Sequence, residues 1–472
     1  MASLSYDEAA HLLRRAGFGG TPDEIDDLSS RGREGAVDFL INFNTIDNSS
    51  MQNLLTASFD FSDFGNNDKF NNGEIRRWWF TRMVATKRQF EEKMTLFWHN
   101  HFATSSSKVQ DVFMYNQNVL LRANAFGKFD DLLLKVSQDA AMLIWLDNIT
   151  NVLGKPNENF GRELQELFSM GINDVVTGEQ NYTEQDVKEV ARAFTGWDYQ
   201  RRVPFTFQLK ANQHDNGTKT IYGQQANFSG EDVITIISAR AATARYLTWK
   251  LFNFFVYPVT TGAADKSTID KFSKVYLNNN HSIKELVRAI FTSDEFYSSR
   301  AFFSLIKQPA ELVVGAVRML GGTYNPGSTV TAGSRTSNTL AQLARNMGQD
   351  MFAPPDVAGW DMNLAWVNTA SMLERFNFAN TYVTNRNTTN PGVFVTADQL
   401  RTMTKASSKK TVKKFLVRLG PLSTDALGTL RAYLETGDNG QPVTFVNDDA
   451  TIDKKIRGLV HQIMCLPEFQ LN

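Results

Sequence analysis

Two glutamates near the middle of the chain have the spacing of an acid–base or ligand pair. Glu163 and Glu166 lie three residues apart in a stretch with helical periodicity, so their carboxylates are neighbours on one helix face. Two carboxylates placed in this way repel each other unless a cation, a shared proton or an arginine lies between them. Pairing with Arg162 or Arg192, or plain solvation, would give the pair a structural role, whereas a bound metal ion would give it a catalytic one.

Two histidines form a second candidate group. His99 and His101 follow a helical stretch that ends in a Phe-Trp pair, and a run of small polar residues, 103–107, comes directly after them. In a helix, residues two apart point about 200° away from each other, whereas in an extended segment they share a side. The polar run predicts that the helix has ended by His101, so that both imidazoles are able to bind one metal ion. The alternative is that both are hydrogen-bonded packing residues.

A third group lies at the predicted tip of a β-hairpin. Residues 203–209 alternate in polarity and residues 219–222 return, with a turn at 215–217 between them. His214 and Asp215 would then lie at the tip. They are either turn residues, chosen for backbone hydrogen bonds, or a proton-transfer or ligand pair directed over the helical core.

If these groups meet in one pocket, they form the donor set of a metal-assisted hydrolase or transferase. His99, His101 and Glu163 would bind a divalent ion, with Zn, Mn, Fe, Ca and Mg all compatible with imidazole and carboxylate ligands. Glu166, or His214 with Asp215, would act as general base, and Arg162 would stabilise developing negative charge. The alternative is a non-catalytic binding or assembly protein, in which the same polar groups hold the core and aromatic loops bind a glycan or a partner chain.

The elements that must position the glutamates are two helices joined by a polar loop. The first has one apolar stripe and ends near Gly171, where a glycine is suited to the left-handed turn. The second begins at a capping box formed by Thr183 and Asp186 and ends at Gly196. The stripe residues of the two helices are Phe160, Leu164, Leu167, Phe168, Val187, Val190, Ala191 and Phe194.

Composition limits the remaining classes of function. The 472 residues carry a formal net charge of −1, so no overall field would draw the protein to nucleic acid. The single cysteine excludes an internal disulfide. The longest apolar stretch, 247–259, contains Lys250 and Asn253, so we expect no membrane span. No basic region followed by an apolar run opens the chain, so we expect a cytoplasmic protein, or an exported one whose leader has been removed.

Helical periodicity over most of the chain predicts a mainly α-helical globule with a small β-hairpin insert. We expect one domain, 1–472, because no segment has the composition of a linker. Its parts are a helical core at 1–200, the hairpin insert at 201–230, further helical core at 231–385 with a Gly/Ser/Thr-rich loop at 321–337, and a helical segment at 386–472. Phosphate-binding loops, dinucleotide-binding glycine motifs and nucleophile elbows do not occur in the sequence.

The order of motifs resembles the bacterial "domain of unknown function 1800" family. The stretches that carry the resemblance are HLLRRAGFG (11–19), FWHNHF (97–102), NEN (157–159), RE (162–163), ELF (166–168), YT (182–183), DV (186–187), AFTGW (193–197), His214-Asp215 with Lys219, and FAPPDVAGW (352–360). The family has no assigned activity. The resemblance implies that members are often encoded beside a second family similar to sulfatases and alkaline phosphatases, which suggests a sulfatase-like partner protein and an anionic or glycan-type substrate.

Overall fold

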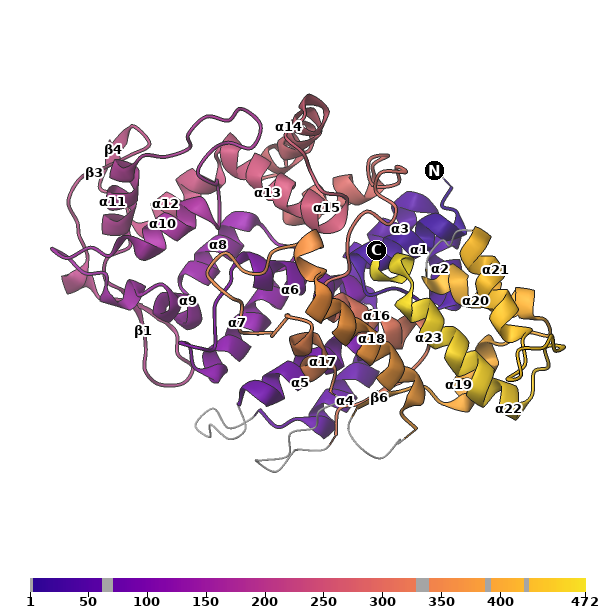
Figure 1. The fold of residues 1–472 in the computed structure, drawn as a ribbon. Helices are drawn as coiled ribbons and strands as arrows, with labels where there is room; N and C mark the ends of the chain where they lie inside the picture. Colours follow the sequence, from indigo (N-terminus) through magenta and orange to yellow (C-terminus); the bar gives the residue numbers. More distant parts are fainter. Residues whose placement is uncertain (1–2, 62–70, 328–338, 387–391, 420–423) are drawn as a thin grey trace.

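The computed structural model describes residues 3–61, 71–327, 339–386, 392–419 and 424–472 (Figure 1). In these residues the protein is mainly α-helical, as predicted, and its strands form three small two-stranded sheets. The core contains buried side chains from both ends of the chain, from Leu4 to Phe469. None of the helices in the described ranges is long and apolar enough to cross a lipid bilayer.

The N-terminal part is built from short helices that begin at side-chain caps. Ser5 with Glu8 and Thr21 with Glu24 form reciprocal caps, which satisfy the first backbone N–H groups of the first two helices. The elements are α1 (Tyr6–Ala16), α2 (Pro22–Ser30), α3 (Gly32–Ile41), η1 (Phe43–Thr45), α4 (Ser49–Ser58), α5 (Asn72–Ala85), α6 (Gln89–His101), α7 (Asp111–Ala123), α8 (Phe129–Ser137), α9 (Ala140–Trp145) and η2 (Asn148–Thr150).

The predicted helix pair is present as α10 (Glu158–Glu166) and α11 (Glu184–Ala193). The apolar stripes face inward, and Gly161 lets the two backbones approach closely, since a Cβ atom there would lie 3.2 Å from the backbone nitrogen of Ala191. Gly171 and Gly196 both have positive φ, 76° and 77°, in the turns that follow the two helices. The pair therefore holds the outer face of α10, which carries both glutamates, in a fixed position.

The insert that follows contains two hairpins where the sequence predicted one. Strand β1 (Trp197–Tyr199) pairs with β2 (Phe207–Leu209), and β3 (Lys219–Ile221) pairs with β4 (Gln224–Ala226). The predicted pairing of 203–209 with 219–222 is therefore wrong. The reason is a two-residue turn at Tyr222 and Gly223, both at positive φ, which matches the twist of a tight hairpin and pairs β3 with the residues after it.

The second half of the chain returns to helices that pack around the first. Its elements are η3 (Ala211–Gln213), α12 (Gly230–Ser238), α13 (Ala241–Phe255), α14 (Ala263–Asn278), α15 (Ile283–Thr292), α16 (Pro309–Met319), α17 (Leu340–Asn346), η4 (Asn363–Trp366) and α18 (Thr369–Thr384). Strand β5 (Thr323–Asn325) pairs with β6 (Gly392–Phe394), so the first residues of the predicted 321–337 loop are part of a small sheet. Residues 328–337 of that loop lie outside the described ranges.

The C-terminal helices lie beside the N-terminal ones (Figure 1). They are α19 (Ala397–Met403), α20 (Ser408–Leu419), α21 (Thr424–Leu434), α22 (Asp449–Thr451), η5 (Ile452–Ile456), α23 (Arg457–Cys465) and η6 (Pro467–Gln470). Tyr6 of α1 and Pro22 of α2 line a hollow together with lysines of α20, which places the first and last quarters of the chain side by side. The four-part division of the domain stays a prediction.

Candidate functional site

The two histidines lie on α6, which continues through His101. The prediction that the helix had ended before this residue is wrong, because the backbone N–H of Phe102 still bonds to the carbonyl of Trp98 at 2.8 Å. The imidazoles therefore point to different sides of the helix. His99 accepts a hydrogen bond from the backbone N–H of Phe352 at 3.2 Å, whereas Nε2 of His101 lies 3.0 Å from the carbonyl of Phe168.

Both histidines are buried among aromatic rings. His99 lies edge-on to Trp79 and Phe352, and His101 lies 6.5 Å from the ring of Tyr246, measured between centroids. Burial lowers the pKa of each imidazole to about 3, so both are neutral at physiological pH. The Nδ1 atom of His101 is buried and has no hydrogen-bond partner in the described residues.

The low pKa of His99 predicts a loss of stability in mild acid. Below pH 6.5, the ordinary imidazole pKa, His99 binds a proton in the unfolded chain. In the folded chain it stays neutral until the pH falls to about 3. The unfolding free energy should therefore fall between pH 6.5 and 3, by roughly 2 kcal/mol at pH 5 from this residue. Urea unfolding of wild type and His99→Gln at pH 7.5 and 5.0 measures the difference. Equal pH dependence in the two proteins would contradict this assignment.

The glutamate pair is at the half-buried surface of α10. Glu166 accepts a hydrogen bond from the hydroxyl of Tyr182 at 3.1 Å. Glu163 makes neither a side-chain hydrogen bond nor an ion pair with the described residues, and burial, followed by the charge of Glu166, raises its pKa. The two carboxylates thus have different surroundings, which is the arrangement that separates an acid from a base.

Two tyrosines lie beside Glu166, and a lysine lies beside one of them. Tyr182 precedes α11, and Tyr246 and Lys250 lie one turn apart on α13. Burial and the charge of Glu166 raise the pKa of both tyrosines, so both hydroxyls stay protonated. Lys250 forms no hydrogen bond or ion pair with the described residues, and its Nζ lies 5.6 Å from the ring centre of Tyr246. The sequence had two signals for these residues: Tyr182 in the YT motif, and a lysine inside an otherwise apolar run.

Arg162 is turned away from Glu163. Its guanidinium binds both carboxylate oxygens of Glu184 on α11, at 2.8 and 2.7 Å, and lies 3.5 Å from Glu158. These contacts join α10 to the start of α11 on a partly exposed surface. In this structure Arg162 is therefore a link between helices, and its predicted role in charge stabilisation stays a prediction.

His214 and Asp215 follow η3 and are fastened to the end of α11, so their predicted place at a hairpin tip is wrong. Arg192 binds Asp215 through Nε at 2.8 Å and Nη2 at 3.2 Å, and this contact lowers the pKa of the carboxyl. The Nδ1 atom of His214 lies 2.8 Å from the carbonyl of Thr195, and the Asp215 N–H donates to the Thr195 hydroxyl. In the described ranges neither residue forms a hydrogen bond or an ion pair with Glu163.

The predicted ligands are thus brought together only in part. Glu163 and Glu166 are neighbours, but His99 and His101 face opposite sides of α6. Among the described residues there is no group of three or more histidine, cysteine, aspartate or glutamate side chains that would hold a metal ion. The proposed set of His99, His101 and Glu163 is not such a group, and a divalent cofactor stays a prediction.

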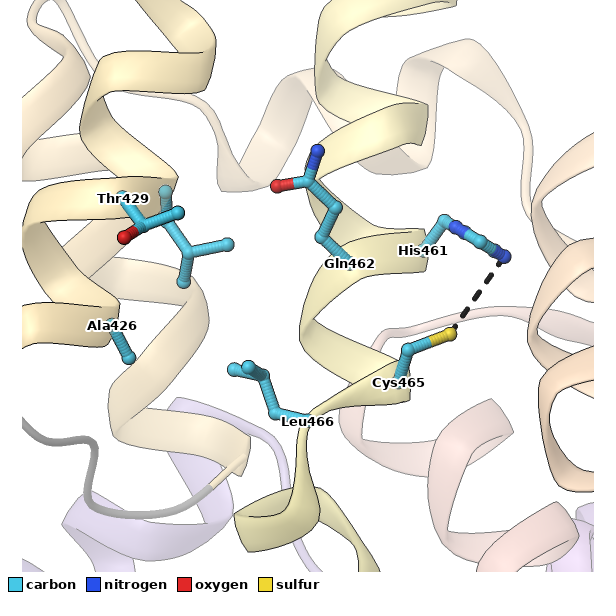
Figure 2. Close-up of a pocket in the computed structure, with 7 residues that line it drawn as sticks. Ala426, Thr429, His461, Gln462, Cys465 and Leu466 are labelled. Carbon is cyan, nitrogen blue, oxygen red and sulfur yellow. Dashed lines mark hydrogen bonds between the residues drawn. The ribbon is translucent and has the colours of Figure 1, made fainter. Parts of the chain in front are cut away.

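A separate open pocket of about 380 Å³ lies between α21 and α23. Figure 2 shows His461 and Cys465 one helical turn apart on α23, with Nε2 and Sγ 3.8 Å apart, while Leu466 points toward α21. Burial raises the pKa of the Cys465 thiol. The thiolate is the reactive form of cysteine, so this pocket does not hold an activated nucleophile.

Cys465 should accordingly react slowly with thiol reagents. At pH 7.4 we expect the folded protein to react with a disulfide reagent more slowly than free cysteine does, and the rate to keep rising above pH 9, because burial disfavours the thiolate. Absorbance of the released aromatic thiolate measures the rate. The urea-unfolded protein is the control and should react at the rate of free cysteine. A folded protein that reacts equally fast would contradict the raised pKa.

Comparison with known proteins gives one match. No curated protein and no solved structure matches the chain. The family model described as "Protein of unknown function (DUF1800)" matches residues 11–471, which is nearly the whole chain and includes α1, α6, α10 and α11. The chain therefore belongs to the DUF1800 family.

Proposed function

We propose that the protein is a hydrolase or transferase that acts on a glycan-type or anionic substrate, with Glu163 and Glu166 as its acid–base pair. The observation that supports this most is the state of Glu163. It is a half-buried carboxyl with a raised pKa that forms neither a hydrogen bond nor an ion pair with the described residues, although the charge of Arg162 acts on it. It lies beside a second carboxylate, which accepts a hydrogen bond from a tyrosine. A carboxyl that only maintained the fold would be expected to have a partner.

In this mechanism the two carboxylates take different roles. Glu163, in its acid form, donates a proton to the leaving-group oxygen of the substrate. Glu166, which accepts the O–H of Tyr182, acts as the base on the attacking group or as the nucleophile. Lys250 lies beside Tyr246 without an ion pair among the described residues, and it would hold a negative group of a substrate that extends past this tyrosine.

A divalent ion is compatible with the same pair. Carboxylate oxygens are ligands for Mg, Ca, Mn, Fe and Zn, and an ion between Glu163 and Glu166 would relieve their repulsion. The imidazoles of His99 and His101 are both engaged elsewhere, at Phe352 and Phe168. An ion between the two glutamates would therefore be coordinated by the glutamates, the substrate and solvent.

A second candidate function is binding or assembly without catalysis. One observation favours it, since the family motifs hold one another inside the fold. Asn100 accepts from the backbone N–H of Trp360 at 2.7 Å and donates to its carbonyl at 3.2 Å, and His99 holds Phe352, at the two ends of the 352–360 motif. In this function the fixed aromatic segment would bind a polysaccharide or a sulfatase-like partner protein.

The experiment that tests the proposal is a turnover screen of the purified protein. Neutral, sulfated and phosphorylated oligosaccharides are incubated with enzyme, with and without a chelator, and products are separated by chromatography, while elemental analysis gives the metal content. We expect release of product from at least one glycan class. Retention of an oligosaccharide without product in any arm, with affinity unchanged in Glu163→Gln, would favour the binding function.

A further inference from the structure

A cluster of buried cations lies at the centre of the molecule, away from the glutamate pair. It joins α1, α6, the segment before α16, and α18. Its members are at most 4% exposed: Arg14, Arg15, Lys93, Lys307 and Arg375. The charges of Arg14, Lys93 and Arg375 act on Lys307, and Arg15 interacts with Arg14 and Lys93, so the five belong to one group. Two of them, Arg14 and Arg15, are in the HLLRRAGFG motif, which the proposed function does not use.

The cluster contains one buried carboxylate, Glu311, which already forms an ion pair with Lys93. Glu311 also accepts the backbone N–H of Gln308 at 3.0 Å and the side-chain amide of Asn472 at 2.9 Å. It is the acidic residue that acts on Arg15, Lys307 and Arg375. Among the described residues, no second buried aspartate or glutamate acts on the guanidinium groups; Arg14 is acted on by Asp7, whose side chain is exposed.

The guanidinium groups stay charged at neutral pH. Burial lowers the pKa of Arg14 and Arg375 to about 10 and that of Arg15 to about 9, all well above 7. Their contacts are to neutral groups. Arg15 donates to the carbonyl of Ala301 at 2.5 Å, and Arg375 donates to that of Lys307 at 2.8 Å. Carbonyl oxygens satisfy donors but do not cancel the charge.

Several buried donors also have no acceptor in the described residues. They are Nε of Arg14, Nε and Nη1 of Arg15, and Nε of Arg375. Arg14 is the extreme case, because its side chain makes no hydrogen bond to the described residues and its guanidinium lies 4.5 Å from the ring centre of Phe303. A buried charge without a partner costs several kcal/mol.

At another buried site the same protein pairs its arginines with a carboxylate. Glu92 is 0% exposed and accepts from Arg82 and Arg122 as well as from the indole of Trp79, at 2.8 to 3.0 Å. There, carboxylate and guanidinium groups satisfy one another within the chain. The contrast with the Glu92 site indicates that the cluster around Arg14 binds a counter-ion from solution.

We propose that the interior between α1, α6 and α18 binds a small tetrahedral dianion, phosphate or sulfate, through Arg14, Arg15 and Arg375. Guanidinium groups match the oxygen spacing of such anions and bind them through paired N–H donors, whereas chloride offers a single point of contact. Because all five cations are buried, the unesterified ion fits better than a phosphate or sulfate group carried on a larger molecule.

The test is thermal unfolding of the whole chain at constant ionic strength, with sodium chloride exchanged stepwise for sodium phosphate or sodium sulfate. We expect the melting temperature to rise and saturate as the oxyanion fills one site. Ion chromatography of acid-denatured protein, after purification in phosphate and removal of free ion, should recover about one oxyanion per chain, as a filled single site requires. Phenyl phosphate distinguishes a phosphate ester from the free ion. If it raises the melting temperature as much as phosphate does, the site binds an ester group; if it does not raise the melting temperature, the site binds the free ion.

Arg14→Gln is the diagnostic variant. In chloride it should melt at or above the wild-type temperature, because one repelling charge is gone. In phosphate it should melt below wild type, with a midpoint for phosphate at least about tenfold higher, the effect of one charge-assisted contact. Arg31→Gln is the matched control, since Arg31 also lies on an aromatic ring, 3.9 Å from the centre of Phe39, but is exposed and remote from Glu311.

The proposal is overturned if wild type melts at the same temperature in chloride, phosphate and sulfate. It is equally overturned if Arg14→Gln and Arg31→Gln respond alike to phosphate. The wild-type titration needs no variant, so the result stands even if Arg14→Gln fails to fold. None of these measurements uses Glu163, and the outcome is independent of the proposed hydrolase activity.

Discussion

A Glu163→Gln variant should lose roughly 10²–10⁴-fold in kcat/KM on the substrate found by the turnover screen, the usual contribution of a positioned general acid. The amide has the shape of the carboxyl but cannot donate the proton. Because Glu163 has no ion pair to lose among the described residues, the melting temperature should be unchanged or slightly higher. Steady-state kinetics and thermal unfolding on the same preparation measure both effects.

The pH dependence of the activity tests the same role of Glu163 in a second way. Burial raises the pKa of Glu163, so its acid form persists to higher pH than that of an exposed glutamate. Wild-type activity should fall as the pH rises through this pKa, and that limb should be absent from the residual activity of Glu163→Gln. Glu158→Gln is the control, since Glu158 is on the same helix but pairs with Arg162. Equal losses in both variants would remove Glu163 from the chemistry.

A Glu92→Gln variant should lower the free energy of unfolding by roughly 3–5 kcal/mol, the typical result of breaking a buried ion pair from one side. Glu92 is 0% exposed, and its oxygens accept from Arg82, Arg122 and Trp79. A neutral amide at this position would leave two buried guanidinium groups without a counter-charge. Urea unfolding followed by circular dichroism measures the change. Glu91→Gln is the matched control. Glu91 is adjacent to Glu92 but forms no ion pair with the described residues, so this substitution should change the free energy of unfolding little.

The contribution of Glu92 should also depend on pH. Burial alone would raise its pKa, but the charges of Arg122 and Arg82 lower it from 4.5 to about 2. Its stabilisation is therefore complete above pH 4.5 and is lost as the pH falls toward 2, a difference of roughly 3 kcal/mol. The gap between wild type and Glu92→Gln should narrow over this range. A gap that stays constant down to pH 2 would show that folding does not lower the pKa of Glu92.

Local patterns predicted the scaffold of the site well. The apolar stripes, the capping box at Thr183 and Asp186, and the left-handed turns at Gly171 and Gly196 are present, although α10 ends at Glu166, before the predicted stop at Gly171. These features depend on residues within three or four positions of one another. The hairpin pairing failed because a turn at Tyr222 and Gly223 competed with the predicted one, and the short segments offered little periodicity to decide between them.

The side-chain partners could not be predicted in the same way. His99 binds the backbone of Phe352, 253 residues away. Arg192 forms an ion pair with Asp215 and holds this carboxylate at the end of α11. Tyr246 and Lys250 approach Glu166 and His101 only because α13 packs behind α10 and α6.

The sequence by itself thus determined the helices, their buried faces and the adjacency of Glu163 and Glu166, because helical geometry relates neighbouring residues directly. The tertiary structure decided which charges are paired. It gave Glu92 two arginines, left Arg15 and Arg375 with one shared carboxylate, Glu311, and left Arg14 with the exposed Asp7. Coulomb and desolvation energies depend on distances between residues that lie hundreds of positions apart, and those distances exist only once the helices have packed.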